Sequence, residues 1–283
     1  MTRTLSHVAI AIALTATVGV TAQQQGDVIE RPALAERYAR VSRMVEAVSG
    51  KRPATDDEVY ALLLAGMKDP DVFVRGESVG MVANLVMVPS IPQLASNLEW
   101  IVARRAVGER LWPELDAATD DPDPRVRTQA LRGIAGAFTL GLPTYVLPSQ
   151  IANRLLDKFE RDPSQGVRSL AVSAFQSAHR SEYPAVRSIG SLVLLQALDD
   201  SDPHIVATAA HAIPDWKPAE ALPLLVKHLK NPSLHARMAV AQIIAAYRQD
   251  ARPYLPQLEA ALAAETDDIT KKTIAGTLSV VRE

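Results

Sequence analysis

The chain contains no cysteine among its 283 residues. Thiol catalysis, disulfide exchange and thiolate metal sites are therefore excluded, and an oxidising compartment would find no thiol to act on. Aromatic residues make up only 5% of the sequence and glycine only 13 positions, whereas alanine, leucine and valine occur in long tracts. Strands recruit aromatic and β-branched residues, while alanine and leucine lose little side-chain entropy in helices. We therefore predict an all-α protein.

A strong net charge is also absent, because the formal charge at neutral pH is only −2. A nucleic-acid partner needs a dense basic surface that displaces counterions from phosphates. We therefore expect no nucleic acid as partner.

The N-terminal segment has an apolar run, but a short one. The uncharged, mostly apolar run over residues 8–20 follows Arg3 and ends at Val20-Thr21-Ala22. Spanning a bilayer takes roughly 20 apolar residues, whereas a basic start, a short apolar run and small residues at the cut are typical of a secretory signal. We expect a signal peptide over 1–22, a linker over 23–31 and a secreted, periplasmic protein of the bacterial cell envelope, without stable membrane insertion after signal removal. A retained N-terminal anchor is the alternative.

A seven-residue pattern recurs along the chain. It begins with an acidic or capping-type residue and ends six positions later at a residue that is usually basic, which we call the anchor residue. The copies are DPDVFVR ending at Arg75, DPDPRVR at Arg127, DPSQGVR at Arg168, DSDPHIV at Val206, NPSLHAR at Arg237 and ETDDITK at Lys271.

An apolar stripe follows each anchor residue. Of the eighteen residues three, four and seven positions after the anchors, seventeen are apolar and the exception is Ser78. This spacing is one face of a 3.6-residue period, so a second helix starts at each turn, and a similar stripe such as Leu222, Leu225 and Leu229 marks a first helix before it. Each unit is therefore predicted to be two helices joined by a tight turn.

The turns contain aspartate or asparagine followed by proline. Such a residue caps a helix by accepting from a free N–H, and proline fits the first helical position, where its missing N–H is not needed. We interpret Asp123-Pro124, Asp162-Pro163, Asp202-Pro203 and Asn231-Pro232 as caps of this kind. A calcium loop would need a glycine and a distal glutamate that are absent here, so capping is favoured over a cation site.

These turns, with the helices that follow them, resemble HEAT repeats, and in particular the short HEAT-like repeats of the phycobilisome-lyase type. The resemblance covers roughly residues 56–283. It implies a right-handed α-solenoid of about six HEAT-like helix pairs over 32–283, an armadillo-like helical fold. A helix over 32–49 would cap the first pair, Thr55 and Glu58 would form a capping box, and the segment IPQLASNLEWIVARRAVGERLWPEL would supply an extra helix and the next first helix.

No catalytic motif was found. The chain has no His-Glu dipeptide of the kind that HEAT-repeat hydroxylases use, and no nucleophile elbow, phosphate loop or dinucleotide fingerprint. His204 and His235 occupy equivalent positions and are expected about 10 Å apart, the spacing of packed helices. We interpret them, with His179, His211 and His228, as solvated turn residues, and we predict no catalytic residue, cofactor or metal.

The remaining function is binding through a surface. Positions two and five after each anchor residue lie off the buried stripe and are predicted to face a groove lined by second helices. This lining is mostly small and uncharged, which favours a protein segment as ligand for a monomeric, noncatalytic scaffold. The alternative is an enzyme or accessory factor with a metal or cofactor in the groove. The candidate groove residues are Glu77, Gln129, Arg132, Ser173, Thr208, His211 and Gln242.

Overall fold

The computed structural model describes residues 31–87, 99–140, 146–176, 178–213 and 216–283. The predicted signal peptide, residues 1–22, lies outside these ranges, as does the predicted linker except for Arg31, which begins a helix. No helix in the described ranges is long and apolar enough to cross a membrane.

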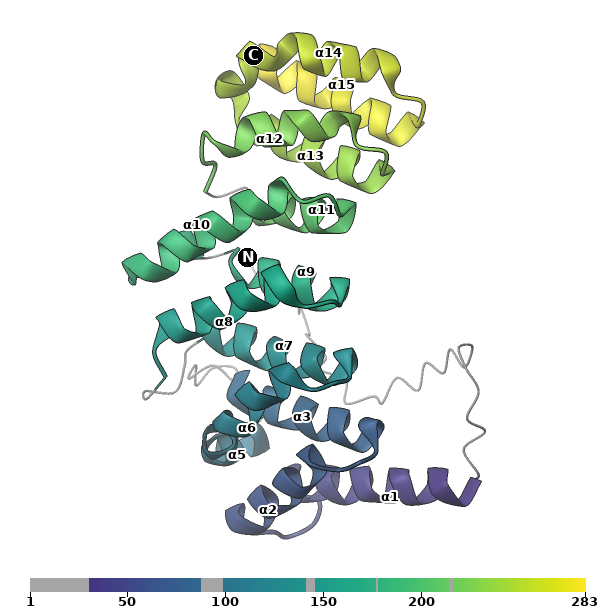
Figure 1. Ribbon diagram of the computed structural model, residues 1–283, viewed down its shortest axis with the longest axis vertical. Helices are drawn as coiled ribbons and strands as arrows, with labels where there is room; N and C mark the ends of the chain where they lie inside the picture. The colour runs from purple at the N-terminus through teal and green to yellow at the C-terminus, as the bar shows by residue number, and fades with distance from the viewer. Residues whose placement is uncertain (1–30, 88–98, 141–145, 177, 214–215) are drawn as a thin grey trace, which may run out of the picture.

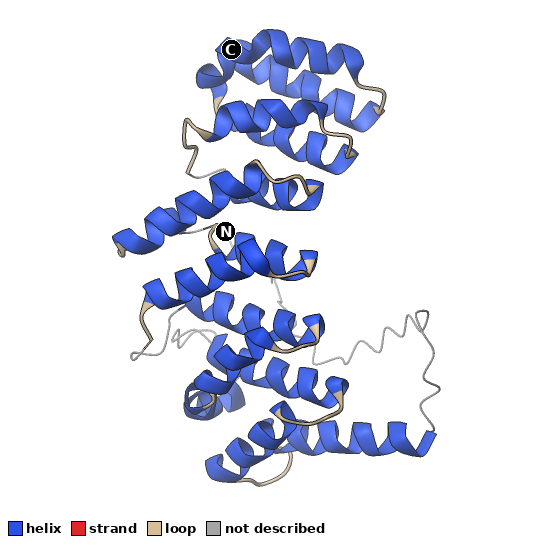
Figure 2. Ribbon diagram, viewed as in Figure 1, coloured by secondary structure: helices blue, strands red, loops and turns tan. Residues whose placement is uncertain are grey.

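The described residues form helices and no strand, which confirms the predicted all-α fold (Figure 2). Short 3₁₀ turns at 118–120, 178–180, 228–230 and 248–254 extend or join the α-helices. The α-helices run over Arg31–Val48 (α1), Asp56–Met67 (α2), Val72–Met87 (α3), Glu99–Arg110 (α5), Trp112–Ala117 (α6), Pro124–Leu140 (α7), Pro148–Arg161 (α8), Gln165–Ala174 (α9), Pro184–Leu198 (α10), Pro203–Ala212 (α11), Ala221–Lys227 (α12), Leu234–Ala246 (α13), Leu255–Ala264 (α14) and Asp268–Arg282 (α15).

The helices stack as antiparallel pairs along one long axis, from α1 and α2 at one end to α14 and α15 at the other (Figure 1). The first helices α2, α6, α8, α10, α12 and α14 each pack on the second helix that follows. Each second helix also packs on the next one, in the order α3, α7, α9, α11, α13 and α15. The second helices thus form a continuous layer, as expected for a solenoid.

The predicted apolar stripe forms the core between these layers. Seventeen of its eighteen residues are buried, including Ser78, whose hydroxyl donates to the carbonyl of Val74 at 2.7 Å. The exception is Ala275 in α15, which is exposed. Helix α15 packs on α13, α14 and the 3₁₀ turn at 248–254, and Ala275 lies outside these contacts in the described structure.

The predicted N-terminal capping helix is present as α1, which packs on α2 and α3. It buries Met44, Ala47 and Val48, while Tyr38 remains 42% exposed. The predicted capping box also forms, because the Glu58 amide donates to Thr55 Oγ1 and the Thr55 amide donates to the Glu58 carboxylate. The insertion before the second turn contributes α5, which packs on α2 and α3, and the first helix α6.

Two of the four predicted aspartate-proline caps are correct. Asp123 and Asp202 precede the first helical residues Pro124 and Pro203, and their carboxylates accept from the amides of Arg125 and His204 at 2.8 and 2.9 Å.

The other two assignments are wrong, because α9 and α13 begin two residues later, after Ser164 and Ser233. The side chains of Asp162 and Asn231 instead accept from the amides of these serines at 2.9 Å and so close the turn before the helix. Their prolines occupy turn positions, not the first position of a helix.

Candidate functional site

The turns between paired helices are joined to one another by arginine and acidic side chains. Arg75 Nε donates to Asp121 at 2.6 Å, Arg127 Nε to Asp162 at 2.8 Å and Arg237 Nε to Glu265 at 2.7 Å. In each case the acceptor is the first residue of the next seven-residue pattern. The anchor residue therefore links its own turn to the following one.

Arginine and aspartate side chains also link the other turns, but the paired positions differ. Arg168 donates to Asp202 at 3.2 Å, two residues beyond the equivalent acceptor Asp200. At the N-terminal end, Arg37 and Arg40 of the capping helix donate to Asp71 and Asp69 at 2.6 and 2.7 Å, so α1 replaces a preceding repeat. Because these side chains are partly or fully buried and already paired, they are structural groups and not available ligands.

The linkage is interrupted between α11 and α13. The anchor position there is Val206, which is fully buried, and the equivalent acceptor in the next turn is the neutral Asn231. Asn231 Nδ2 donates to His228 Nδ1 at 3.0 Å instead. His228 is 7% exposed, so its prediction as a solvated histidine is wrong, and its burial lowers its pKa. The arginine and the acidic residue that form the linkage in other turns are thus both replaced by uncharged residues here, Val206 and Asn231.

The candidate groove residues all lie on second helices, as predicted. Position five after the anchor is exposed in four consecutive units, at Arg132 in α7, Ser173 in α9, His211 in α11 and Gln242 in α13. Position two is half-buried at Glu77, Gln129 and Thr208.

Two positions predicted to face the groove are buried. They are Gly80, at position five of α3, and Ala239, at position two of α13. Position five is therefore exposed in each unit from α7 to α15, and in the four units from α7 to α13 it carries a side chain larger than hydrogen. We call Arg132, Ser173, His211 and Gln242 the position-five row.

The structure brings some candidate residues together between α3 and α7. Burial raises the pKa of Glu77, while the positive charge of Arg132 opposes this shift. Arg132 Nη2 also donates to Asn84 Oδ1 at 3.5 Å, and the buried Gln129 Oε1 has no hydrogen-bond partner in the described part of the chain. This end of the layer is therefore polar and carries opposite charges.

The hydroxyls of the other candidates are used within their own helices. Ser173 Oγ donates to the carbonyl of Leu170 at 2.9 Å, and Thr208 Oγ1 donates to that of His204 at 2.8 Å. Each hydroxyl oxygen can still accept a hydrogen bond from a ligand. These two hydroxyl groups are therefore neutral hydrogen-bond acceptors for a ligand.

Three histidines gather where α11 meets α13. The ring centroids of His204 and His235 lie 6.1 Å apart, closer than the predicted 10 Å. His211 lies 6.3 Å from His235 with nearly parallel planes, a contact that sequence reasoning missed. All three rings are exposed. As they lie, no group of three or more acidic or histidine side chains among the described residues has the geometry of a metal site.

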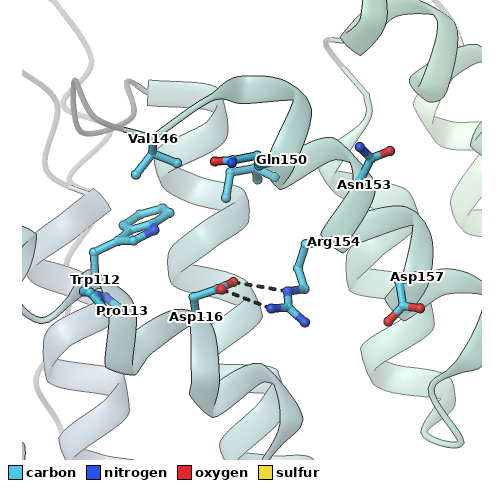
Figure 3. A pocket seen from close by; sticks show the side chains of 9 residues that line it. Trp112, Pro113, Asp116, Val146, Gln150, Asn153, Arg154 and Asp157 are labelled. Carbon is cyan, nitrogen blue, oxygen red and sulfur yellow. Dashed lines mark hydrogen bonds and ion pairs between the residues drawn. The ribbon is translucent and has the colours of Figure 1, made fainter.

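A separate cleft of about 750 Å³ lies on the layer of first helices, between α6 and α8 (Figure 3). Its wall includes the ring of Trp112 and an ion pair in which Arg154 Nη2 lies 3.0 Å from Asp116 Oδ2. Arg154 also pairs with Asp120 at 3.1 Å, and the amides of Gln150 and Asn153 are exposed at the wall of the cleft. The described residues that line the cleft include no pair of groups arranged for acid-base or nucleophilic chemistry.

The comparisons with known proteins agree with this architecture. The family model for HEAT repeats matches residues 191–279. No curated protein is significantly similar to the chain in sequence.

Solved structures of engineered proteins share the fold. One engineered protein is 17% identical, with a TM-score of 0.51 over 79% of this chain and 98% of its own. A designed armadillo repeat protein in complex with the peptide (KR)4 is also 17% identical, with a TM-score of 0.50 over 77% of this chain and 98% of its own. At this identity the likeness concerns the fold alone.

The family model identifies HEAT repeats within residues 191–279. The seven-residue turns and the buried stripes in this part of the chain agree with that match. The narrower resemblance to the phycobilisome-lyase type stays a prediction. Residues 191–279 match the family model for HEAT repeats, and the described residues form an α-solenoid of stacked helix pairs.

Proposed function

We propose that the protein is a noncatalytic scaffold that binds a segment of another protein along its layer of second helices. The observation that carries the proposal is the position-five row, whose members are exposed in four consecutive units while the neighbouring stripe is buried. A row repeated once per unit offers regularly spaced contacts to an extended or helical segment.

The chemistry of the row favours a polypeptide over other partners. It combines one cation at Arg132 with neutral hydroxyl, imidazole and amide groups, so it lacks the positive density that a polyanion needs. Polar side chains of this kind exchange hydrogen bonds with a peptide backbone, which has one donor and one acceptor at nearly every residue.

The double variant Arg132→Glu with Gln242→Glu tests this proposal. Both side chains are exposed and off the buried stripe, so the free energy of unfolding is expected to change by no more than about 1 kcal/mol in total. Binding of a protein that co-purifies with the unaltered chain from its native cells is expected to fall at least about tenfold. The reason is that the new charges are unpaired against a partner that matched the original surface.

A matched control changes the opposite layer. Gln150→Glu with Asn153→Glu adds two charges to exposed positions of the first helix α8, in the cleft of Figure 3. Dissociation constants of the purified partner for the three proteins then separate the two layers. Equal binding by the position-five variant and the unaltered chain would overturn the proposal, as would a loss confined to the α8 variant.

We also propose that the protein is exported and acts in the cell envelope. The support is the basic start, the apolar run over 8–20 and the small residues at Val20-Thr21-Ala22. N-terminal sequencing of the protein from fractionated cells is expected to show a mature chain that begins near Gln23. A cytoplasmic protein that begins at Met1 would contradict export.

A further inference from the structure

Three exposed imidazoles lie together on the second-helix layer, although they come from two helices. His204 and His211 belong to α11, and His235 belongs to the adjacent α13 (Figure 1). His235 lies between the other two, with ring centroids 6.1 Å from His204 and 6.3 Å from His211. All three residues are exposed, so dissolved ions reach this part of the layer.

These separations are close to what a shared metal ion requires. A metal-nitrogen bond of about 2.1 Å places the centroid of an imidazole about 3.2 Å from the ion, so two ligating rings have centroids at most about 6.4 Å apart. At a tetrahedral angle the separation is about 5.2 Å, which an exposed side chain reaches by a small rotation. His204 and His211 are seven residues apart, about 10 Å along the helix, so both join His235 but not each other.

One of the rings is already oriented for metal binding. His211 Nδ1 lies 2.7 Å from the carbonyl oxygen of Ala207, and a carbonyl only accepts, so Nδ1 carries the proton and donates it. The lone pair of the neutral ring is then on Nε2. Histidines that bind metals almost always donate the other ring N–H to such an acceptor, which fixes the tautomer and the ring orientation.

We propose that His211 and His235 form a binding site for a divalent late transition-metal ion, of the class of Cu²⁺ and Zn²⁺. Imidazole nitrogen is a preferred ligand for these ions. The two ring centroids lie 6.3 Å apart, and a rotation of the exposed His235 side chain brings its ring nitrogen to an ion held by His211 Nε2. His204 is the second-choice partner of His235, since no hydrogen bond orients its ring in the described part of the chain.

The site has two protein ligands, and water occupies the other positions on the ion. This agrees with the absence of any group of three or more acidic or histidine ligands in the described ranges. The inference goes beyond the proposed scaffold function and does not depend on it, because it concerns the affinity of the isolated chain for an ion.

Titration of the untagged full chain with Cu²⁺ in a non-coordinating buffer tests the site. Isothermal titration calorimetry is expected to give one ion per chain, and electron paramagnetic resonance is expected to show coupling to imidazole nitrogens. His235→Gln keeps the side chain polar and exposed and is expected to weaken binding at least about tenfold. His211→Gln is expected to have a similar effect, and His204→Gln a change below about twofold.

The controls separate loss of a ligand from loss of structure. Lys272→Ala and Ser279→Ala alter exposed residues of α15 in the same layer without removing an imidazole, so Cu²⁺ affinity should stay unchanged, and far-ultraviolet circular dichroism should be the same for all variants. Unchanged affinity in His235→Gln would overturn the site, as would absence of imidazole coupling in the unaltered chain. Loss of binding in His204→Gln but not in His211→Gln would overturn the assigned pair.

Discussion

The guanidinium of Arg127 and the carboxylate of Asp162 meet in a two-point hydrogen bond between consecutive helix pairs, with Nε–Oδ2 and Nη2–Oδ1 distances of 2.8 and 2.9 Å. The side chains are only 10% and 2% exposed. The remaining nitrogen, Nη1, donates to the carbonyls of Asp121 and Pro122 in the turn before Arg127. One side chain thus fixes its own turn and the next turn relative to each other.

Replacement of this arginine should be strongly destabilising. In Arg127→Ala the buried Asp162 carboxylate loses its counter-ion, and breaking a buried pair in this way costs about 3–5 kcal/mol. Arg125→Ala is the matched control, because Arg125 pairs with Asp123 but is 75% exposed, so a loss below about 1 kcal/mol is expected. Urea unfolding of both variants measures the difference. Equal losses would show that the buried linkage does not stabilise the stack.

The interrupted linkage at Val206 and Asn231 can be tested by restoring it. Val206→Arg alone places a charge at a fully buried position, and Asn231→Asp alone leaves a carboxylate without its arginine, so each should destabilise. In the double variant the two charges meet as in the other turns, so the double change should cost about 0.5–3 kcal/mol less than the sum of the single changes. A double-mutant cycle by urea unfolding measures this coupling, and additive losses would contradict the equivalence of these positions.

The sequence was sufficient for features that depend on neighbouring residues. The stripes at positions three, four and seven and the capping box at Thr55 were predicted correctly because helix periodicity and capping act within one or two turns. The prediction that Asp162 caps a helix was wrong for a local reason. DPDPRVR contains two aspartate-proline pairs, and only the second pair starts a helix; Asp162 occupies the position of the first pair. The acidic partner of each anchor arginine lies in another repeat, so the pairing depends on how the repeats stack on one another.

The candidate site was predictable in part. Placement of the groove residues on one layer follows from helix geometry, whereas the exposure of Arg132 and the burial of Ala239 depend on how each helix is rotated against its neighbours. The approach of His211 to His235 depends on the offset between α11 and α13, which no local pattern specifies. His204 and His235 occupy equivalent positions in neighbouring repeats, which predicted that they lie near each other. The predicted separation of about 10 Å was larger than the observed 6.1 Å.

Alanine is expected to have opposite effects at two glycines. Gly133 lies where α3 and α7 approach closely, whereas Gly276 lies in open space on α15. A Cβ at Gly133 would lie 2.6 Å from Ala83 Cβ and 2.7 Å from its Cα, so Gly133→Ala must push the helices apart and should cost about 1–3 kcal/mol. A Cβ at Gly276 in α15 meets nothing within 4 Å, so Gly276→Ala should stabilise by about 0.4–1 kcal/mol through helix propensity and chain entropy. Thermal unfolding of the two variants measures both, and shifts of the same sign would contradict this packing.

The pair of Arg237 and Glu265 predicts a specific pH dependence near the C-terminal end of the stack. Hydrogen bonds from Arg237 lower the pKa of Glu265 from 4.5 to about 2, although burial opposes the shift, and the amides of Asp267 and Thr266 add to it. The Glu265 side chain is only 2% exposed. A carboxyl whose pKa is lower in the folded state stabilises the fold when it is ionised.

The sign of this linkage determines the pH window. Above pH 4.5 Glu265 is ionised in both states and its stabilisation is fully present; as the pH falls from 4.5 towards 2, the unfolded chain takes up the proton first and the stabilisation is lost. Glu265→Gln cannot ionise, so it should be less stable than the parent by about 2 kcal/mol at neutral pH, and the difference should shrink through this window.

Glu259→Gln is the control. It breaks a pair with Arg282 that is more than half exposed, so it should change stability little at any pH. Urea unfolding of the three proteins at several pH values measures the differences. A Glu265→Gln deficit that stayed constant from neutral pH to pH 2 would mean that the carboxylate contributes through its shape and not through its charge.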